Sequence, residues 1–333
     1  MNRARFQQIA TRFGNLKLLV VGDLILDEFI WGKVRRISPE APVPVVEVSR
    51  ETYYPGGAAN VARNLREFAG QIHLLGLVGC DDHAKRLKTL LDGEQIQPDC
   101  LIADSEYRTI VKTRIIAHHQ QMVRVDREEK RGLTATQIGE ALRKLDALIH
   151  GIDGIIIEDY GKGLLTQELV DAIVSRARAA GKIVTVDPNP GNTLAWNGVA
   201  TIKPNRSEAF ATAGKPHSEP VDPPTRDTAL LEVGEALMRR WNTESLLVTL
   251  GEQGIMLFHR DNSPFHIPAQ AREVFDVSGA GDTVIALFTL SLCAGATPAE
   301  AAEIANRASG IVVGKLGTAK VSYEELSASF EQD

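Results

Sequence analysis

The segment Asp276-Val-Ser-Gly-Ala-Gly-Asp282 is the part of the sequence best suited to chemistry, and an apolar run over 283–293 follows it directly. It contains three consecutive small residues, Gly279, Ala280 and Gly281. Such residues let the backbone bend and approach a ligand closely. If the apolar run is a helix, their N–H groups lie at its N-terminus, where unpaired donors and the helix dipole favour an anion. Asp282 would then hold a carboxylate beside that anion.

A carboxylate next to a bound phosphate needs a purpose, because the two groups repel each other. The natural purpose is that of a general base, which accepts the proton of a hydroxyl group as the hydroxyl attacks the phosphate. The structural alternative is that Asp282 only caps the helix, as aspartates often do. We interpret the motif as a phosphoryl-transfer centre.

A second motif, Lys203-Pro-Asn-Arg-Ser-Glu208, follows a predicted strand and offers Asn205, Arg206, Ser207 and Glu208. Asn205 and Glu208 would share one face of a helix and could hold a hydrated Mg²⁺, which keeps several of its waters. The same spacing also suits a capping box, in which the two residues only close the start of the helix. From the residues alone, both interpretations stay open.

Three further turns could reach a ligand. Thr249, Gly251 and Gly254 lie in a turn between two predicted strands, although a plain hairpin would need no function. Gly56-Gly-Ala-Ala-Asn60 brings a ligand close to the backbone, and Asn60 can both donate and accept hydrogen bonds. Gly22-Asp-Leu-Ile-Leu-Asp27 ends the first predicted strand, where its two carboxylates could hold sugar hydroxyls or cap the next segment.

The elements that must position these motifs alternate between strand and helix. Strands are predicted at 17–21, 72–78, 154–158, 182–187, 200–203 and 245–250, and helices at 58–68, 81–91, 134–149, 166–179, 205–213, 227–241, 279–293 and 298–313. This alternation predicts an α/β fold with a doubly wound, mostly parallel sheet flanked by helices. The segments 30–54 and 106–126 carry strand patterns outside the alternation, and we expect them to form a small β-sheet lid. The proline-rich segment 215–227 leaves the alternation undisturbed, so we expect a single domain over residues 1–333.

Composition and missing motifs exclude several classes of protein. The chain has 333 residues, with 37 Lys and Arg against 43 Asp and Glu, and its net charge of −6 without a basic block argues against a nucleic-acid partner. The three cysteines lie far apart and form no CxxC pair, which fits a reducing cytosol. No apolar run approaches membrane-spanning length, so we expect a cytoplasmic protein without a membrane partner. A P-loop is missing, and the missing GxGxxG disfavours the rival reading as a dinucleotide-dependent oxidoreductase.

Three motifs, taken in order and spacing over nearly the whole chain, resemble the ribokinase-like (PfkB) family of carbohydrate kinases. They are Gly56-Gly57, Asn205-Arg-Ser-Glu208 and Gly279-Ala-Gly-Asp282. Finer features over 36–46, 55–62, 119–126, 159–163 and 314–318 resemble the branch of the family that acts on a heptose phosphate. The resemblance implies ATP-dependent phosphorylation of the anomeric (O1) hydroxyl of D-glycero-β-D-manno-heptose 7-phosphate, in lipopolysaccharide precursor synthesis. Another sugar, sugar phosphate or nucleoside stays open as the substrate, as does a ligand-binding module without turnover.

The resemblance also implies roles for individual residues. Asp282 would be the base, and the amides of Gly279, Ala280 and Gly281 the anion hole. Asn205 and Glu208, with Arg206 and Ser207 between them, would organise Mg²⁺ and phosphates, largely through water. The nucleotide site would include Thr249, Gly251, Gly254, Ser278, Asn306 and Gly317, and the sugar site Asp27, Gly56, Gly57 and Asn60. A monovalent cation such as K⁺ could take part, and the lid is expected to pair two chains into a homodimer.

A phosphorylated sugar needs cations at its far end, and the lid offers Arg36, Arg114 and Arg124, with Lys162 after a central strand. Arginine suits this task because its planar fork binds phosphate in a bidentate manner. We select Arg114 and Lys162, with solvated or surface-paired side chains as the alternative.

Two features depart from the resemblance. Position 158 is Glu, where a smaller polar residue is expected. The HxGH motif is typical of the nucleotidyltransferase domain that is often fused to such kinases, and the eight histidines here form no such motif. We therefore expect a stand-alone kinase or a fragment. Adenylyl transfer is assigned to neither.

Overall fold

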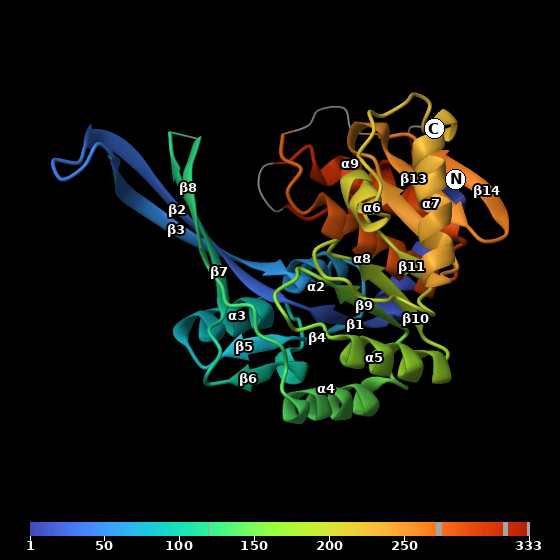
Figure 1. The fold of residues 1–333 in the computed structure, drawn as a ribbon, viewed down its shortest axis with the longest axis horizontal. Coiled ribbons are helices and arrows are strands. Elements are labelled where there is room, and N and C mark those ends of the chain that lie inside the picture. The colour runs from blue at the N-terminus through green and yellow to red at the C-terminus, as the bar shows by residue number, and fades with distance from the viewer. Residues whose placement is uncertain (119, 271–274, 316–318, 332–333) are drawn as a thin grey trace.

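The computed structural model describes residues 1–118, 120–270, 275–315 and 319–331. An eight-stranded sheet with the order β14-β13-β12-β11-β10-β9-β1-β4 forms its centre (Figure 1). The strands are β1 (Lys17–Gly22), β4 (Gln71–Leu75), β9 (Gly154–Glu158), β10 (Ile183–Asp187), β11 (Thr201–Ile202), β12 (Ser245–Thr249), β13 (Ile255–His259) and β14 (Asn262–Ile267). The strands from β4 to β12 pair in parallel, and β13 and β14 are added antiparallel. The predicted fold class is confirmed.

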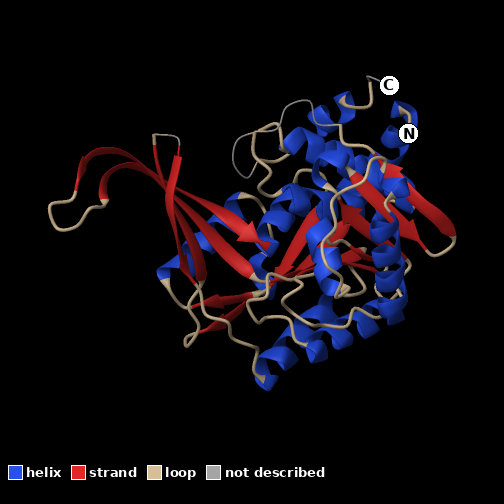
Figure 2. Ribbon diagram, turned by 45° about the horizontal axis from the view of Figure 1, so that its top comes forward, coloured by secondary structure: helices blue, strands red, loops and turns tan. Residues whose placement is uncertain are grey.

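Helices cover both faces of this sheet, as Figure 2 shows in blue. They are α1 (Arg3–Ala10), α2 (Ala58–Arg66), α3 (Asp82–Gly93), α4 (Ala135–Leu148), α5 (Gln167–Ala179), α6 (Arg206–Thr212), α7 (Thr228–Trp241), α8 (Ala280–Cys293), α9 (Pro298–Val312) and α10 (Tyr323–Ala328). Side chains of β1 alternate between two cores: Leu18 and Val20 pack with α2, α8 and α9, whereas Leu19 and Val21 pack with α4, α5 and α7. Because both faces are covered, the central strands are apolar throughout.

A second sheet with the order β3-β2-β7-β8 projects away from the body (Figure 1). Its strands are β2 (Leu24–Ile37), β3 (Pro44–Gly57), β7 (Ile110–Ala117) and β8 (Gln120–Arg127). The strands β2 and β3 run further toward the body than the predicted segment 30–54. Asp27 and Gly56 therefore lie within this sheet, where it meets the main sheet.

The single strand predicted at 72–78 is two strands. It breaks at Gly76 into β4 and β5 (Leu77–Gly79), and β5 pairs in parallel with β6 (Ile102–Asp104) in a small separate sheet. A Cβ at Gly76 would lie 2.5 Å from the Leu24 side chain, so the chain can pass there only as glycine. The apolar run continues through the break, which is why its pattern predicts one strand.

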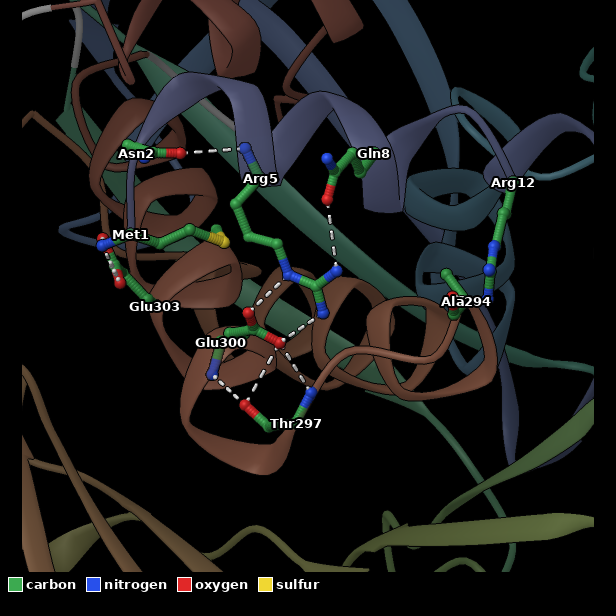
Figure 3. Close-up of polar contacts among 9 residues, drawn as sticks. All are labelled: Met1, Asn2, Arg5, Gln8, Arg12, Ala294, Thr297, Glu300 and Glu303. Carbon is green, nitrogen blue, oxygen red and sulfur yellow. Dashed lines mark hydrogen bonds and ion pairs between the residues drawn. The ribbon is translucent and has the colours of Figure 1, made fainter.

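The N-terminal helix α1 was not predicted, because its sequence is mostly polar. Polar contacts hold it against the start of α9 (Figure 3): Arg5 pairs with Glu300 at 2.6 Å, and the Met1 amino group pairs with Glu303 at 2.7 Å. Phe6 provides the buried apolar contact. Across the part of the chain that the structure describes, no helix combines the length and the apolar character needed to span a membrane.

Candidate active site

The predicted anion nest forms the start of α8. Gly279 adopts a left-handed conformation with φ of +79° and precedes the helix, so its backbone turns in a way that favours glycine. Ala280 and Gly281 then give the first turn of α8, where backbone N–H groups have no partner within the helix. Asp282 lies in the same turn, so the carboxylate and the nest are brought together as predicted.

Two side chains from other elements hold the carboxylate of Asp282. Asn60 on α2 donates its Nδ2–H to Oδ2 at 2.6 Å, and Tyr160, just after β9, donates its hydroxyl to Oδ1 at 2.9 Å. Burial and the charge of Asp187 raise the pKa of Asp282, the two donors and Lys203 lower it, and together they place it at about 6. Asp282 is therefore ionised at neutral pH and still basic enough to accept a proton.

Tyr160 is a site residue that the sequence analysis missed. Its loop is held by Asp23, whose carboxylate accepts hydrogen bonds of 3.0–3.2 Å from the backbone N–H groups of Tyr160, Lys162 and Leu164. Asp23 thus holds a loop that is distant in the sequence, which neither of the two predicted roles anticipated. The only signal for Tyr160 was its place in the stretch 159–163, which carries the resemblance but gives no hint of a contact with Asp282.

A cavity of about 610 Å³ lies against the nest, a volume typical of small-molecule sites. Several predicted nucleotide residues line it together with the nest: Thr249, Gly251, Gly254, Asn306, Ala280 and Gly281. Ser309 and Gly310 on α9, which were not predicted from the sequence, also lie on its wall. Ser278 is exposed and its amide donates to Asp276, and the predicted contact at Gly317 lies outside the described residues.

The motif at 205–208 forms the capping box that was the structural alternative. The backbone N–H of Glu208 donates a hydrogen bond to Asn205 Oδ1 at 2.9 Å, and the backbone N–H of Asn205 donates one to Glu208 Oε2 at 2.8 Å. A β-bridge between Asn205 and Thr249 places this box beside the cavity. Ser207 donates to Asn205 Oδ1, whereas Arg206 turns away and pairs with the buried Asp227 at 2.7 Å.

The capping box still fits a hydrated Mg²⁺. Among the described contacts, Glu208 uses only one carboxylate oxygen in the box, which leaves Oε1 as a hard ligand of the kind Mg²⁺ prefers. Burial raises the pKa of Glu208, which a nearby cation would reverse.

The predicted sugar residues meet where the two sheets join. Asp27 is buried and pairs with Arg114 at 2.5 Å. A Cβ at Gly56 would lie 2.1 Å from the Asp27 carboxylate, and Gly57 has a φ of +59° at the start of α2, so both positions need glycine. Asn60 keeps a buried Oδ1 that accepts no hydrogen bond from the described residues, which suits a ligand hydroxyl.

Cations gather on one face of the second sheet beside Asp27. Lys112 and Arg114 are two residues apart on β7 and therefore share a face, opposite Asp126 and Arg124 on β8. Burial and the charge of Lys162 lower the pKa of Lys112, which the sequence analysis had not selected. Lys162 itself pairs with Glu128 at 2.8 Å.

Arg36, by contrast, lies exposed near the outer end of β2, opposite Val45.

Comparison with known proteins agrees with this geometry. A family model described as pfkB family carbohydrate kinase matches residues 15–325. The chain belongs to the PfkB family of carbohydrate kinases. The match covers the nest, Asp282, the 205–208 motif and the strands of the second sheet, so the family resemblance seen in the sequence is confirmed.

Three curated relatives share the name bifunctional protein HldE. Those from Caulobacter sp. and Edwardsiella ictaluri are 42% identical over 94% of this chain, and that from Pelobacter propionicus is 40% identical over 98%. The matched region is only 62–65% of the length of these relatives. The present chain thus spans less than two thirds of the proteins it matches.

Solved structures show the same fold at low identity. The ribokinase of Arabidopsis thaliana, complexed with ribose and ATP, has a TM-score of 0.72 at 16% identity over 96% of this chain and 99% of its own. Phosphofructokinase-2 from Escherichia coli, in complex with potassium, has a TM-score of 0.73 at 17% identity over 95% and 98% of the two chains. At such identities the likeness establishes the ribokinase-like fold alone.

The hydrogen bond from Tyr160 to Asp282 gives a prediction about pH. Replacement of Tyr160 by Phe removes a donor that stabilises the ionised carboxylate, so the pKa of Asp282 rises above about 6. As the solution is made more acidic, the variant should therefore lose activity at a higher pH than the wild type does. We expect the activity at pH 6 relative to pH 8 to fall by up to about tenfold, the effect of one hydrogen bond to a charged group.

The measurement is the pH profile of kcat/KM for the wild type and the Tyr160→Phe variant, with Tyr323→Phe, an exposed position, as the control. A loss by the same factor at every pH would contradict the role of Tyr160 in setting the basicity of Asp282.

Proposed function

We propose that this chain transfers the γ-phosphoryl group of ATP to the anomeric hydroxyl of D-glycero-β-D-manno-heptose 7-phosphate and so makes the 1,7-bisphosphate, a step toward ADP-heptose. The observation that carries the proposal is the carboxylate of Asp282, held by two donors in the same helix turn as the nest and beside the cavity. The choice of a heptose phosphate is supported by the identity of 40–42% to the HldE proteins and by the resemblance of the finer motifs.

In this reaction Asp282 accepts the proton of the sugar O1 hydroxyl. The bond from O1 to the γ-phosphorus forms while the bond from that phosphorus to the bridging oxygen breaks, and ADP leaves. The N–H groups of the nest hold the oxygens of the group in transfer. A positioned base contributes about 10²–10⁴ in rate and a backbone anion hole about 10²–10³ for each donor, so both are needed for an efficient kinase.

Asn205 and Glu208 would hold Mg²⁺ through its waters, because their box lies beside the cavity and one Glu208 oxygen has no hydrogen bond in the described part of the chain. When bound, the ion neutralises charge on the phosphates. A monovalent cation such as K⁺ stays within the proposal, since phosphofructokinase-2, a structural neighbour, was solved in complex with potassium.

Replacement of Asp282 by Asn tests the base. The variant keeps a side chain of the same shape but cannot accept the proton, so kcat should fall by about 10²–10⁴. The affinity for ATP should stay within about threefold of the wild type, because the amides of the nest and the walls of the cavity are unchanged. An ADP-release assay gives kcat, and calorimetry gives the affinity.

The control is Asp261→Asn, an exposed carboxylate between β13 and β14, which should leave turnover unchanged. A purified, folded Asp282→Asn protein with near-normal turnover would eliminate Asp282 as the base.

The cationic face of the second sheet is the proposed site of the distal phosphate. Lys112, Arg114 and Arg124 share this face, and Lys162 approaches Lys112 from the loop after β9. Arg114, Arg124 and Lys162 pair with Asp27, Asp126 and Glu128 in the absence of a ligand. A phosphate would supply oxygens of the kind that an arginine fork binds. Asp27, paired with Arg114, would then stand between this phosphate and the reacting end of the sugar.

Replacement of Lys162 or Arg114 by Ala should raise KM for the phosphorylated sugar by roughly tenfold to a hundredfold, as expected for one lost charged hydrogen bond. KM for ATP should change far less. Arg36→Ala is the matched control, because it removes an exposed arginine at the far end of the same sheet. Equal effects on both substrates would mean that Lys162 and Arg114 support the fold rather than the phosphate.

Screening heptose phosphates, hexose phosphates, ribose and adenosine in the same assay tests the identity of the sugar. We expect turnover to be fastest with the heptose 7-phosphate and slow with sugars that lack a distal phosphate. A preference for adenosine or ribose would assign this chain to another branch of its family.

A homodimer through the second sheet is also part of the proposal. The face opposite the cations carries Ile30, Ile115, Val123 and Val125, which lie in two adjacent cross-strand rows. The side chains of Val123 and Val125 are 47% and 39% exposed. Glu28, Thr113 and Arg127 lie beside these residues on the same face, and a second copy would cover the apolar rows with the same face.

Val123→Glu places a charge on this face and should convert the dimer to a monomer in analytical ultracentrifugation. The control is Val221→Glu, an apolar residue of similar exposure in the segment 215–227. A Val123→Glu protein that sediments as the wild type does would exclude this face as the interface.

A further inference from the structure

Three carboxyl groups lie together beneath the nest. Glu158 at the end of β9 is in register with Asp187 at the end of β10, and Asp282 on α8 lies above them. One oxygen atom from each of the three groups lies within 4.8 Å of the other two. On its other side, Glu158 is in register with Gly22 of β1.

The three carboxyl groups differ in the partners that can stabilise a negative charge. Asp187 pairs with the buried ammonium group of Lys203 at 2.7 Å. Asp282 accepts hydrogen bonds from Asn60 and Tyr160. Glu158 is 1% exposed, and its buried Oε1 has no hydrogen-bond partner among the described residues. The described residues therefore give Asp187 and Asp282 close partners for a negative charge, whereas Glu158 has only the charge of Lys203, which Asp187 already engages.

A proton on Glu158 resolves this imbalance. Three carboxylates within 4.8 Å cannot all ionise beside one ammonium group, and the proton goes to the group with the fewest donors. Burial and the charges of Asp187 and Asp282 raise the pKa of Glu158 well above its usual range, and only Lys203 opposes them strongly. With that proton in place, the cluster holds one ion pair, one ionised Asp282 and one neutral acid.

We propose that Glu158 is a positioning residue for phosphoryl transfer, which as a neutral acid leaves Asp282 the only anion of the three-carboxyl cluster without an ion-pair partner and which inactivates the site when it ionises. This proposal rests on the proposed role of Asp282 as the base. It goes beyond that role because it assigns an alkaline limit to a side chain other than the base.

The physical reason for inactivation is charge. An ionised Glu158 adds a second anion without an ion-pair partner next to the position that the γ-phosphoryl group, itself negative, must approach. The groups facing Glu158 are Asp187 from β10, Asp282 from α8, Lys203 after β11, and Asp159 on its own chain segment. Among these, only Lys203 is a cation, and it is already engaged by Asp187.

The first test is the pH profile of kcat for Glu158→Gln, which keeps the size of the side chain and cannot ionise. The wild type should lose activity in alkaline solution by about tenfold per pH unit once Glu158 ionises, and the variant should not show this fall. Glu235→Gln, an exposed change on α7, is the matched control and should keep the wild-type profile. An alkaline fall that is the same in Glu158→Gln as in the wild type would overturn the proposal.

The second test needs no substrate, so it stands even if the proposed function fails. A carboxyl group whose pKa is raised on folding makes the folded state less stable as the pH rises above the pKa of the unfolded chain. The ratio of the unfolding constants of the wild type and Glu158→Gln should thus grow by about tenfold per pH unit above roughly pH 4.5 in urea titrations. A ratio that does not change with pH would mean that Glu158 is ionised in the folded protein, which overturns the proposal.

Glu158→Ser provides a second neutral variant should the Gln side chain disturb folding, with the same two expectations. A third outcome concerns metal ions, because the cluster could also attract a cation. If Glu158→Gln changes the Mg²⁺ concentration needed for half-maximal activity and leaves the pH profile as it was, the cluster is a cation site and the proposal is wrong.

Discussion

An ionised carboxylate must stand next to a site built for phosphate, and the rest of the structure depends on how this repulsion is managed. The start of α8 fixes both groups in one helix turn, so their distance is set by the backbone. Asn60 and Tyr160 compensate the charge of Asp282 with two hydrogen bonds, and Lys203 adds a positive charge nearby. The carboxylate is thus stable enough to be ionised and buried enough to remain basic.

The topology explains how residues so far apart in sequence reach this point. The parallel strands β1, β9, β10, β11 and β12 end at one edge of the sheet, and the loops after them carry Asp23, Tyr160, Lys203 and Asn205. This edge is where open α/β sheets bind ligands. The second sheet starts from the same edge and brings Asp27 and its cations to the sugar side. One edge therefore collects the base, the capping box and the proposed phosphate site.

Much of this arrangement could be predicted from the sequence, because the signals are local. The nest and Asp282 are consecutive residues before an apolar helix, and alternating strand and helix patterns fix the fold class. Contacts that depend on the tertiary fold could not be predicted, such as Tyr160 with Asp282, Arg206 with Asp227, or the break at Gly76 against Leu24. The box of Asn205 and Glu208 shows a third case, since one spacing serves both the helix start and a metal, and sequence cannot separate them.

The most direct measurement is a structure of the protein with a non-hydrolysable ATP analogue, Mg²⁺ and heptose 7-phosphate. The account predicts that an oxygen of Asp282 lies within hydrogen-bond reach of the sugar O1, about 2.6–3.2 Å away. It also predicts that the γ-phosphate lies over the amides of Gly279, Ala280 and Gly281. A sugar O1 beyond the reach of Asp282, or a γ-phosphate bound away from the nest, would contradict it.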